Sequence, residues 1–304
     1  MNLSVFICAV LLIAGPGLVD FEDLANAHQD LKQATSKKDA AQVKKLAAET
    51  CALARQVIAT PAPENSAEKE AWAQGVAYAR DIELYTEYAL SATALQGPAE
   101  VTVELLSALE QQNPKSKYLD EAYGPYFLAL NQTGAASQIP AIAEKAIAHF
   151  PENEDLLLVL AETAMNRKRN DRALSYAERL LTVLYKHATP GGMSGADWAR
   201  KRSAALGRGH WIAGLMHSEK TQYYEADKDL RAALPLIKGN EGMMAPALYY
   251  LGVANFELGR STLNKARVLE AAKFSEQAAA IKSPFAQLAW HNALVMKAEA
   301  GKMR

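Results

Sequence analysis

Two consecutive stretches of equal length constrain the fold of this chain more than any other feature. Each predicts a helix, a short turn and a second helix, and the repeat that starts at Glu154 follows the one that starts at Asp120 by 34 residues. The second repeat carries an apolar run at 156–161 and a turn at 169–171. A helix pair of this length buries its apolar face only by stacking against its neighbours, so the chain is expected to build a row of such pairs.

Most of the chain beyond residue 17 has apolar residues at helical spacing, interrupted by short breaks rich in glycine, proline and asparagine. Two more helix pairs begin at Gly207 and Ala245, and a final helix runs from Pro284 to Glu299 with Ser283 as its cap. We therefore predict an all-α protein. The other predicted helices cover 20–36, 39–60, 66–95, 99–112, 118–131, 137–150, 153–166, 171–186 and 196–218.

The repeats are unevenly spaced, and the uneven spacing sets the predicted domain boundaries. The longest break is the glycine-rich loop at 189–195, which separates the pair starting at Glu154 from the pair starting at Gly207. From these intervals we expect a leader at 1–17, N-terminal helices at 18–65, repeats at 66–187, a glycine-rich insertion with a helix extension at 188–206, and repeats with a C-terminal capping helix at 207–304.

The first helices of three repeats carry a small residue, at Ala161, Gly214 and Gly252. With these and the other matching residues given below, the chain resembles the tetratricopeptide repeat family over residues 66–301. The resemblance implies a right-handed α-solenoid of degenerate tetratricopeptide-like helix pairs, of the bacterial secreted or periplasmic type. The chain departs from the family pattern at Leu157, where an aromatic residue is expected, and at Ile139, where an alanine is expected. The matching residues are Leu160, Ala161 and Ala173 in the second repeat, Gly214, Tyr223 and Ala226 in the third, and Leu251, Gly252, Gly259, Ala272 and Pro284 in the fourth, the last two after a shift of eight residues.

The resemblance also implies a function, because in that family the first helices of successive repeats line a concave groove that holds a peptide or a partner helix. The second, fifth, ninth and twelfth residues of a repeat face this groove, and aromatic anchors there favour binding. The alternative is that insertions close the groove and these side chains belong to the core. We predict that a protein or peptide partner contacts Leu158, Glu162, Met165, Arg208, Trp211, Leu215, Tyr249, Val253 and Phe256.

The charge balance argues against a nucleic-acid partner. Lysine and arginine number 33 against 34 aspartates and glutamates, whereas nucleic-acid binders usually carry a basic excess. One basic run stands out, and it is either a solvated helix face or a surface for an anionic partner. Its members are Arg200, Lys201, Arg202, Arg208 and His210.

No sequence motif supports a metal site, a cofactor or an enzyme. The two cysteines, Cys8 and Cys51, form no Cys-x-x-Cys, and Cys51 is expected to be a small core residue. The histidines form no zinc motif; His210 and His217 share a helix face but need a third group to hold a metal. Phosphate-binding glycine motifs are absent as well. We therefore predict a non-enzymatic adaptor with no cofactor.

Two other functions stay open. A small molecule or glycan could bind the aromatic side chains of the helix at 66–95, among them Trp72, Tyr78 and Tyr85, although such a set is also typical of helix packing. A hydrolase could use Ser194, because the sequence Gly-Met-Ser-Gly-Ala comes close to a nucleophile elbow, yet no strand is predicted before it.

The N-terminus suggests export. Residues 3–14 form an apolar run of 12 residues followed by Gly-Pro-Gly, too short for a comfortable membrane span and suited to a signal peptide. Residues 1–4 lack the usual lysine or arginine. We expect a cleaved signal and a periplasmic or secreted protein; an uncleaved membrane anchor and a buried N-terminal helix are the alternatives.

Overall fold

The computed structural model describes residues 21–190 and 192–303. These residues form two compact units, and the boundary along the chain lies between Ile139 and Pro140. Every element in this part of the chain is helical, and no strand is formed there. The all-α prediction is therefore confirmed. The expected leader at 1–17 lies outside the described residues. None of the described helices is long and apolar enough to cross a membrane.

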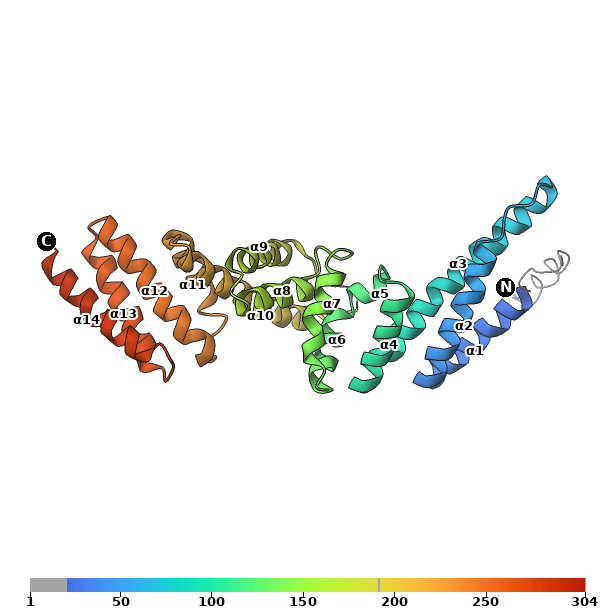
Figure 1. Cartoon of the computed structure of the whole chain (residues 1–304), viewed down its shortest axis with the longest axis horizontal. Helices are drawn as coiled ribbons and strands as arrows, with labels where there is room; N and C mark the ends of the chain where they lie inside the picture. Colours follow the sequence, from blue (N-terminus) through green and yellow to red (C-terminus); the bar gives the residue numbers. More distant parts are fainter. Residues whose placement is uncertain (1–20, 191, 304) are drawn as a thin grey trace. The chain divides into compact units, whose positions relative to one another are not determined.

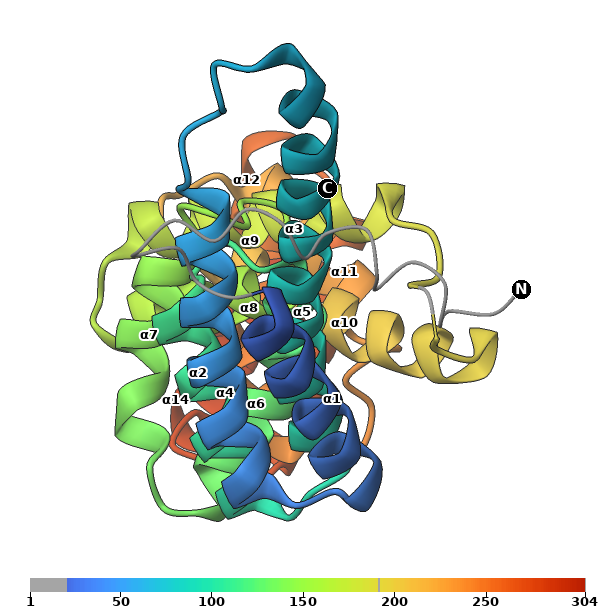
Figure 2. The same ribbon diagram turned by 90° about the vertical axis from the view of Figure 1, so that its right-hand side faces the viewer.

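The first unit consists of helices in which near neighbours along the chain pack together. In sequence order they are α1 (Phe21–Lys37), α2 (Ala40–Ile58), α3 (Ser66–Ala94), α4 (Ala99–Gln112), α5 (Lys117–Asp120), α6 (Tyr123–Gln132) and the short 3-10 helix η3 (Ala136–Gln138). Helix α1 contacts both α2 and α3, and the three lie side by side in Figure 2. Buried Leu24, Val57 and Ile82 join them in one apolar cluster. Asn65 caps α3 and bonds Glu68, as the sequence predicts.

The second unit begins within α7 (Ile139–Ala146) and continues through α8 (Glu154–Asn166), α9 (Asn170–Lys186), α10 (Gly195–Glu219), α11 (Tyr223–Ala233), α12 (Glu241–Ser261), α13 (Lys265–Ala280) and α14 (Ala286–Lys302). From α8 onward each helix contacts the next, and α12, α13 and α14 lie side by side in Figure 1. Helices two apart also touch in the series α8, α10, α12 and α14. The first helices of successive pairs thus form a contiguous row.

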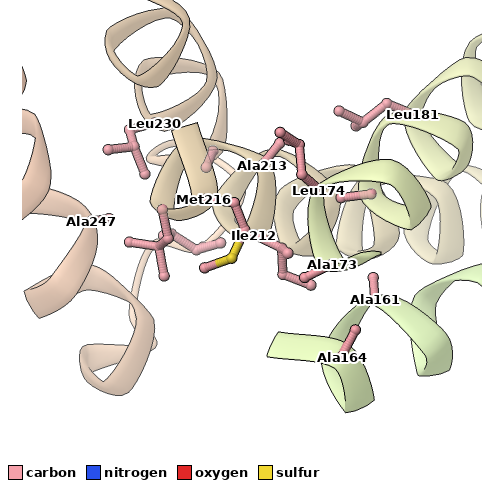
Figure 3. Close-up of a cluster of buried hydrophobic side chains, with 14 of the residues drawn as sticks. Ala161, Ala164, Ala173, Leu174, Leu181, Ile212, Ala213, Met216, Leu230 and Ala247 are labelled. Carbon is pink, nitrogen blue, oxygen red and sulfur yellow. The ribbon is translucent and has the colours of Figure 1, made fainter. Parts of the chain in front are cut away.

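A continuous apolar cluster joins α8 through α12 (Figure 3). Ala161 and Ala173, two of the residues that carry the family resemblance, are fully buried in it. Ile212 and Met216 of α10 lie between them and Leu230 of α11. Small side chains on α8 and α9 let large ones on α10 interdigitate, which is how close packing is reached without voids.

Five of the turns between consecutive helices follow one pattern. In each, a residue with positive φ is followed by a residue whose N–H bonds to the carbonyl five positions earlier, as in Arg169 to Ala164. Gly134 and Lys168, the positive-φ residues of the first two predicted repeats, are 34 residues apart, in agreement with the sequence spacing. The positive-φ residues of the five turns are Lys38, Gly134, Lys168, Thr221 and Leu263.

The turn of the last pair lies four residues later than the predicted repeat start implies. Gly134, Lys168 and Thr221 are each the fifteenth residue of their repeat, but Leu263 is the nineteenth when Ala245 is taken as the first. Helix α12 also starts at Glu241, capped by Asn240, and contains Pro246. Helix α12 therefore extends about one helical turn beyond the expected repeat at each end.

Glycines sit where the paired helices of the second unit cross. A Cβ on Gly214 would lie 2.5 Å from Cγ of Leu230, and one on Gly259 would lie 2.7 Å from Cγ2 of Val268. A Cβ on Gly252 would collide with the Ser275 hydroxyl. Close helix approach explains the three glycines that the family resemblance singled out.

Some predicted helix limits are wrong. The helix expected at 118–131 is two helices, because Pro125 has no N–H and fits best in the first turn of a new helix, α6. The helix expected at 137–150 ends at Ala146. The last helix begins at Ala286 instead of Pro284, and Ser283 accepts from the Phe285 N–H in the preceding turn.

Candidate functional site

Two of the predicted groove residues meet across helices. Arg208 of α10 forms an ion pair with Glu162 of α8, with 46% and 28% of the two side chains exposed. Burial raises the pKa of Glu162, and the opposite charge of Arg208 partly offsets this shift. The pair links α8 to α10, and both side chains remain partly exposed to solvent.

Three more predicted residues surround this pair on the same two helices. Leu158, Met165 and Trp211 are half-buried and pack against the apolar cluster of α8 to α12. The Trp211 indole N–H donates to the Met243 carbonyl, 3.0 Å away, so this side chain ties α10 to the chain of α12. Leu215 is 7% exposed and belongs to the core. For Leu215 the alternative prediction, that the side chain belongs to the core, is correct.

The α12 residues of the prediction follow one face of that helix. Tyr249, Val253 and Phe256 are all half-buried. The Tyr249 ring centroid lies 5.2 Å from that of Phe285, and the Arg260 guanidinium lies 5.4 Å from the centre of the Phe256 ring. Tyr249 and Phe256 pack against different apolar clusters from the one that Leu158 and Trp211 contact.

The displaced turn suggests a second assignment on α12. If the turn residue Leu263 is the fifteenth of its repeat, the second, fifth, ninth and twelfth residues become Tyr250, Val253, Glu257 and Arg260. Val253 is the residue that both assignments share. The Tyr250 hydroxyl also donates to Glu219 at the end of α10, 2.6 Å away.

A buried polar chain on α10 and α11 was missed from the sequence. His210 Nδ1 lies 2.8 Å from Asp229 Oδ1, and its Nε2 lies 3.0 Å from the Tyr185 hydroxyl. His217 Nε2 lies 3.4 Å from the other Asp229 oxygen, and its Nδ1 lies 2.8 Å from Gln222 Oε1. The seven-residue spacing of the histidines placed them on one face, but no sequence pattern pointed to Asp229 as their shared partner.

A second polar cluster lies on the opposite side of α11. Asp227 accepts from Asn255 of α12 at 2.6 Å and from Arg267 of α13 at 3.0 Å. Asp227 and Asp229 are two residues apart and therefore face in nearly opposite directions on a helix. Through them α11 is held to α10 on one side and to α12 and α13 on the other.

The side chains of the basic run identified in the sequence form ion pairs and hydrogen bonds with other residues of the second unit. Lys201 bonds Asp155 at 2.7 Å and Glu154 at 3.0 Å, and Arg202 donates to the Leu184 carbonyl. Burial would lower the pKa of Lys201, but the two carboxylates outweigh it and raise that pKa. Arg200 pairs with Asp197, and Arg208 and His210 have the partners given above. These side chains mainly connect helices and cap a turn.

A cavity of about 380 Å³ opens between α7, α8 and α9. It lies on the face of α8 opposite the predicted groove. The helical repeat places Leu160, Thr163 and Arg167 on one side, and the groove residues Leu158, Glu162 and Met165 on the other. The lining residues are Glu144, Leu160, Thr163, Ala164, Arg167, Arg169, Arg172 and Tyr176.

Most residues of the two alternative sites make contacts within the protein. The Trp72 indole donates to the Thr60 carbonyl, and the Tyr85 ring packs edge-on against His28 with centroids 4.9 Å apart. Tyr78 is 44% exposed. Ser194 caps α10, accepting from the Asp197 N–H and donating to its carboxylate at 2.6 Å. No histidine in the described part of the chain bonds Ser194.

In the described residues no group of three or more histidine, cysteine, aspartate or glutamate side chains is placed to hold a metal ion. Cys51 is buried and free, in agreement with its predicted core position. No protein-family model, curated protein or solved structure matches the chain.

Proposed function

We propose that this protein is a non-enzymatic adaptor: a right-handed α-solenoid of degenerate tetratricopeptide-like helix pairs that binds a segment of a partner protein along α8, α10 and α12. One observation carries the proposal. The first helices of successive pairs touch in order, and all the predicted groove residues except Leu215 keep part of their surface accessible. Such a row supplies a contiguous surface along which a chain segment can lie.

The side chains on this surface indicate what kind of segment would bind. Leu158 and Met165 offer apolar contacts on α8, and half-buried Val253 offers one on α12. The Glu162–Arg208 pair lies between them and offers one donor and one acceptor group. A segment with apolar side chains flanking a polar one, as a peptide or an amphipathic helix, matches this pattern.

A cross-linking experiment tests the proposal. A photoreactive amino acid in place of Val253 should yield adducts with a partner protein, whereas the same amino acid in place of Lys273, exposed on α13, should not. A second substitution, Met165→Lys on α8, should reduce the Val253 adduct, because one segment would contact both helices. Adducts of equal yield at the two positions, or insensitivity to Met165→Lys in a normally folded chain, would exclude a shared groove.

The adaptor is further proposed to act in the cell envelope. The apolar run at 3–14 followed by Gly-Pro-Gly supports export with cleavage after it. Sequencing the N-terminus of the mature protein tests this: a start within about ten residues of position 17 agrees with cleavage, and retention of Met1 would argue for an anchor or for no export.

A further inference from the structure

The cavity between α7, α8 and α9 has the size of a small-ligand site and a strongly polar lining. Its volume of about 380 Å³ falls in the range of pockets that enclose small molecules. Leu160, Ala164 and the ring of Tyr176 provide apolar wall, and Thr163 provides a hydroxyl. The remaining lining is dominated by arginine.

The cavity has an excess of positive charge. Arg167 is neutralised by Glu144, whose Oε1 lies 3.2 Å from its Nη1, and Glu144 is the only acidic residue in the lining. Within the described part of the chain, Arg169 and Arg172 form no ion pair or side-chain hydrogen bond. An arginine stays charged at any physiological pH. Two uncompensated guanidinium groups therefore border the same small space.

The turn between α8 and α9 brings these cations together. Lys168 adopts a φ of 56°, which reverses the chain so that Arg167 ends α8 and Arg169 precedes α9. Arg169 has no acceptor group, and no side chain caps α9. The positive end of the helix dipole adds to the charge of the arginines.

We propose that this cavity binds a small organic anion that carries a phosphate or carboxylate group. The guanidinium groups of Arg169 and Arg172 hold the oxyanion through charge-assisted hydrogen bonds, the interaction for which arginine geometry is suited. The Thr163 hydroxyl and the Tyr176 ring contact the rest of the ligand. The site is independent of the proposed groove, because it occupies the opposite face of α8.

Calorimetric titration of the full chain tests the site. The probes are inorganic phosphate, glucose 6-phosphate and citrate, each compared with chloride at equal ionic strength, so that the phosphate and carboxylate arms identify which anion is preferred. We expect saturable binding of at least one probe. In the double variant Arg169→Gln/Arg172→Gln, binding should weaken by roughly tenfold or more, because two charge-assisted bonds are lost.

A matched variant separates the site from general charge effects. Arg80→Gln/Lys228→Gln removes the same charge from two exposed residues outside the cavity and should bind like the parent chain. Val253→Glu should also leave anion binding unchanged, whatever becomes of the groove. Three results would each overturn the proposal: no saturable binding of any probe, equal weakening in both double variants, or tighter binding of an acidic peptide than of every small anion. Melting temperatures in chloride confirm that the variants fold.

Discussion

The two compact units differ in how fully their buried polar groups are hydrogen-bonded. In the first unit His28 Nε2, Thr50 Oγ1 and Thr93 Oγ1 are buried without a hydrogen-bond partner. In the second, His210 and Asn255 are buried and bonded to aspartates of α11. A buried bonded group dictates which helix lies beside which, whereas an unpaired one only costs stability. In the second unit the aspartates of α11 link it to α10, α12 and α13. In the first unit bonded groups such as Thr86 with Gln112 link α3 to α4 but occur beside unpaired ones.

Of the substitutions considered, removal of Asp229 should lower the free energy of unfolding most. Asp229→Ala leaves His210 and His217 buried without their shared hydrogen-bond partner, and we expect a loss of about 2–3 kcal/mol in the free energy of unfolding of the second unit. Urea denaturation followed by tryptophan fluorescence measures it. Asp171→Ala is the control: its exposed pair with Lys220 should matter little. Equal effects of the two substitutions would show that the buried contacts of Asp229 do not hold the helices of the second unit together.

Substitution of Gly252 tests the close helix crossing of the second unit. In Gly252→Ala the new Cβ would collide with Ser275 and lie 3.2 Å from the Ala271 carbonyl oxygen, so we expect a loss of about 1–2 kcal/mol. Gly301→Ala, where the added carbon meets open space, should stabilise α14 slightly. In the first unit Gly75→Ala meets only the Phe21 ring, which can move, and should cost less than Gly252→Ala. Thermal unfolding ranks the three.

Acid should weaken the first unit through His28. Burial first, and the charge of Lys32 second, lower the pKa of His28 from 6.5 to about 4. Between these pH values the unfolded chain binds a proton at His28 that the folded unit does not bind. The free energy of unfolding therefore falls as the pH falls from 6.5 towards 4.

His28→Phe keeps the edge-on contact with Tyr85 and should recover roughly 1 kcal/mol at pH 4.5, less than the full shift implies because the ring is partly screened by solvent. Hydrogen exchange of α1 to α3 at pH 7 and pH 4.5 measures it. Exchange in α8 and α9 should not change between parent and variant. An unchanged pH dependence in α1 to α3 would contradict the assignment.

The smallest expected effect compares two threonines of the first unit. Thr50→Val removes a hydroxyl that bonds nothing and should stabilise the unit by about 0.5 kcal/mol. Thr86→Val removes a hydroxyl that donates to the Glu83 carbonyl and accepts from Gln112, and should destabilise it by about 1 kcal/mol. Chemical denaturation of both variants shows whether each substitution raises or lowers the free energy of unfolding. If both substitutions shift stability in the same direction, the unpaired group at Thr50 has no cost.

Local patterns sufficed to predict most of the fold. The 34-residue spacing anticipated the identical turns at Gly134 and Lys168, and helix α4 was predicted at its observed limits. The small residues of the family resemblance, such as Gly214, proved to be helix-crossing points. The turn after α12 lies about one helical turn later than predicted, because apolar periodicity identifies a helix more securely than it locates its ends.

The candidate sites depended on contacts between distant residues. Leu215 has the same spacing as its exposed neighbours, so the sequence could not show that it faces the core. Asp229 is twelve residues or more from both of its histidines. The arginines of the cavity were within reach of sequence reasoning, since Arg167, Arg169 and Arg172 flank the predicted turn, but their lack of partners required the structure.

The measurement that tests the proposed function most directly is the affinity of an identified partner, with both components purified. Titration of the parent chain, Val253→Glu and Met165→Lys should show binding at least tenfold weaker for each variant, about 1.4 kcal/mol or more. The control Lys273→Glu, on the exposed side of α13, should bind like the parent. Equal affinities for all four chains, each with a normal melting temperature, would show that the row formed by α8, α10 and α12 does not bind the partner.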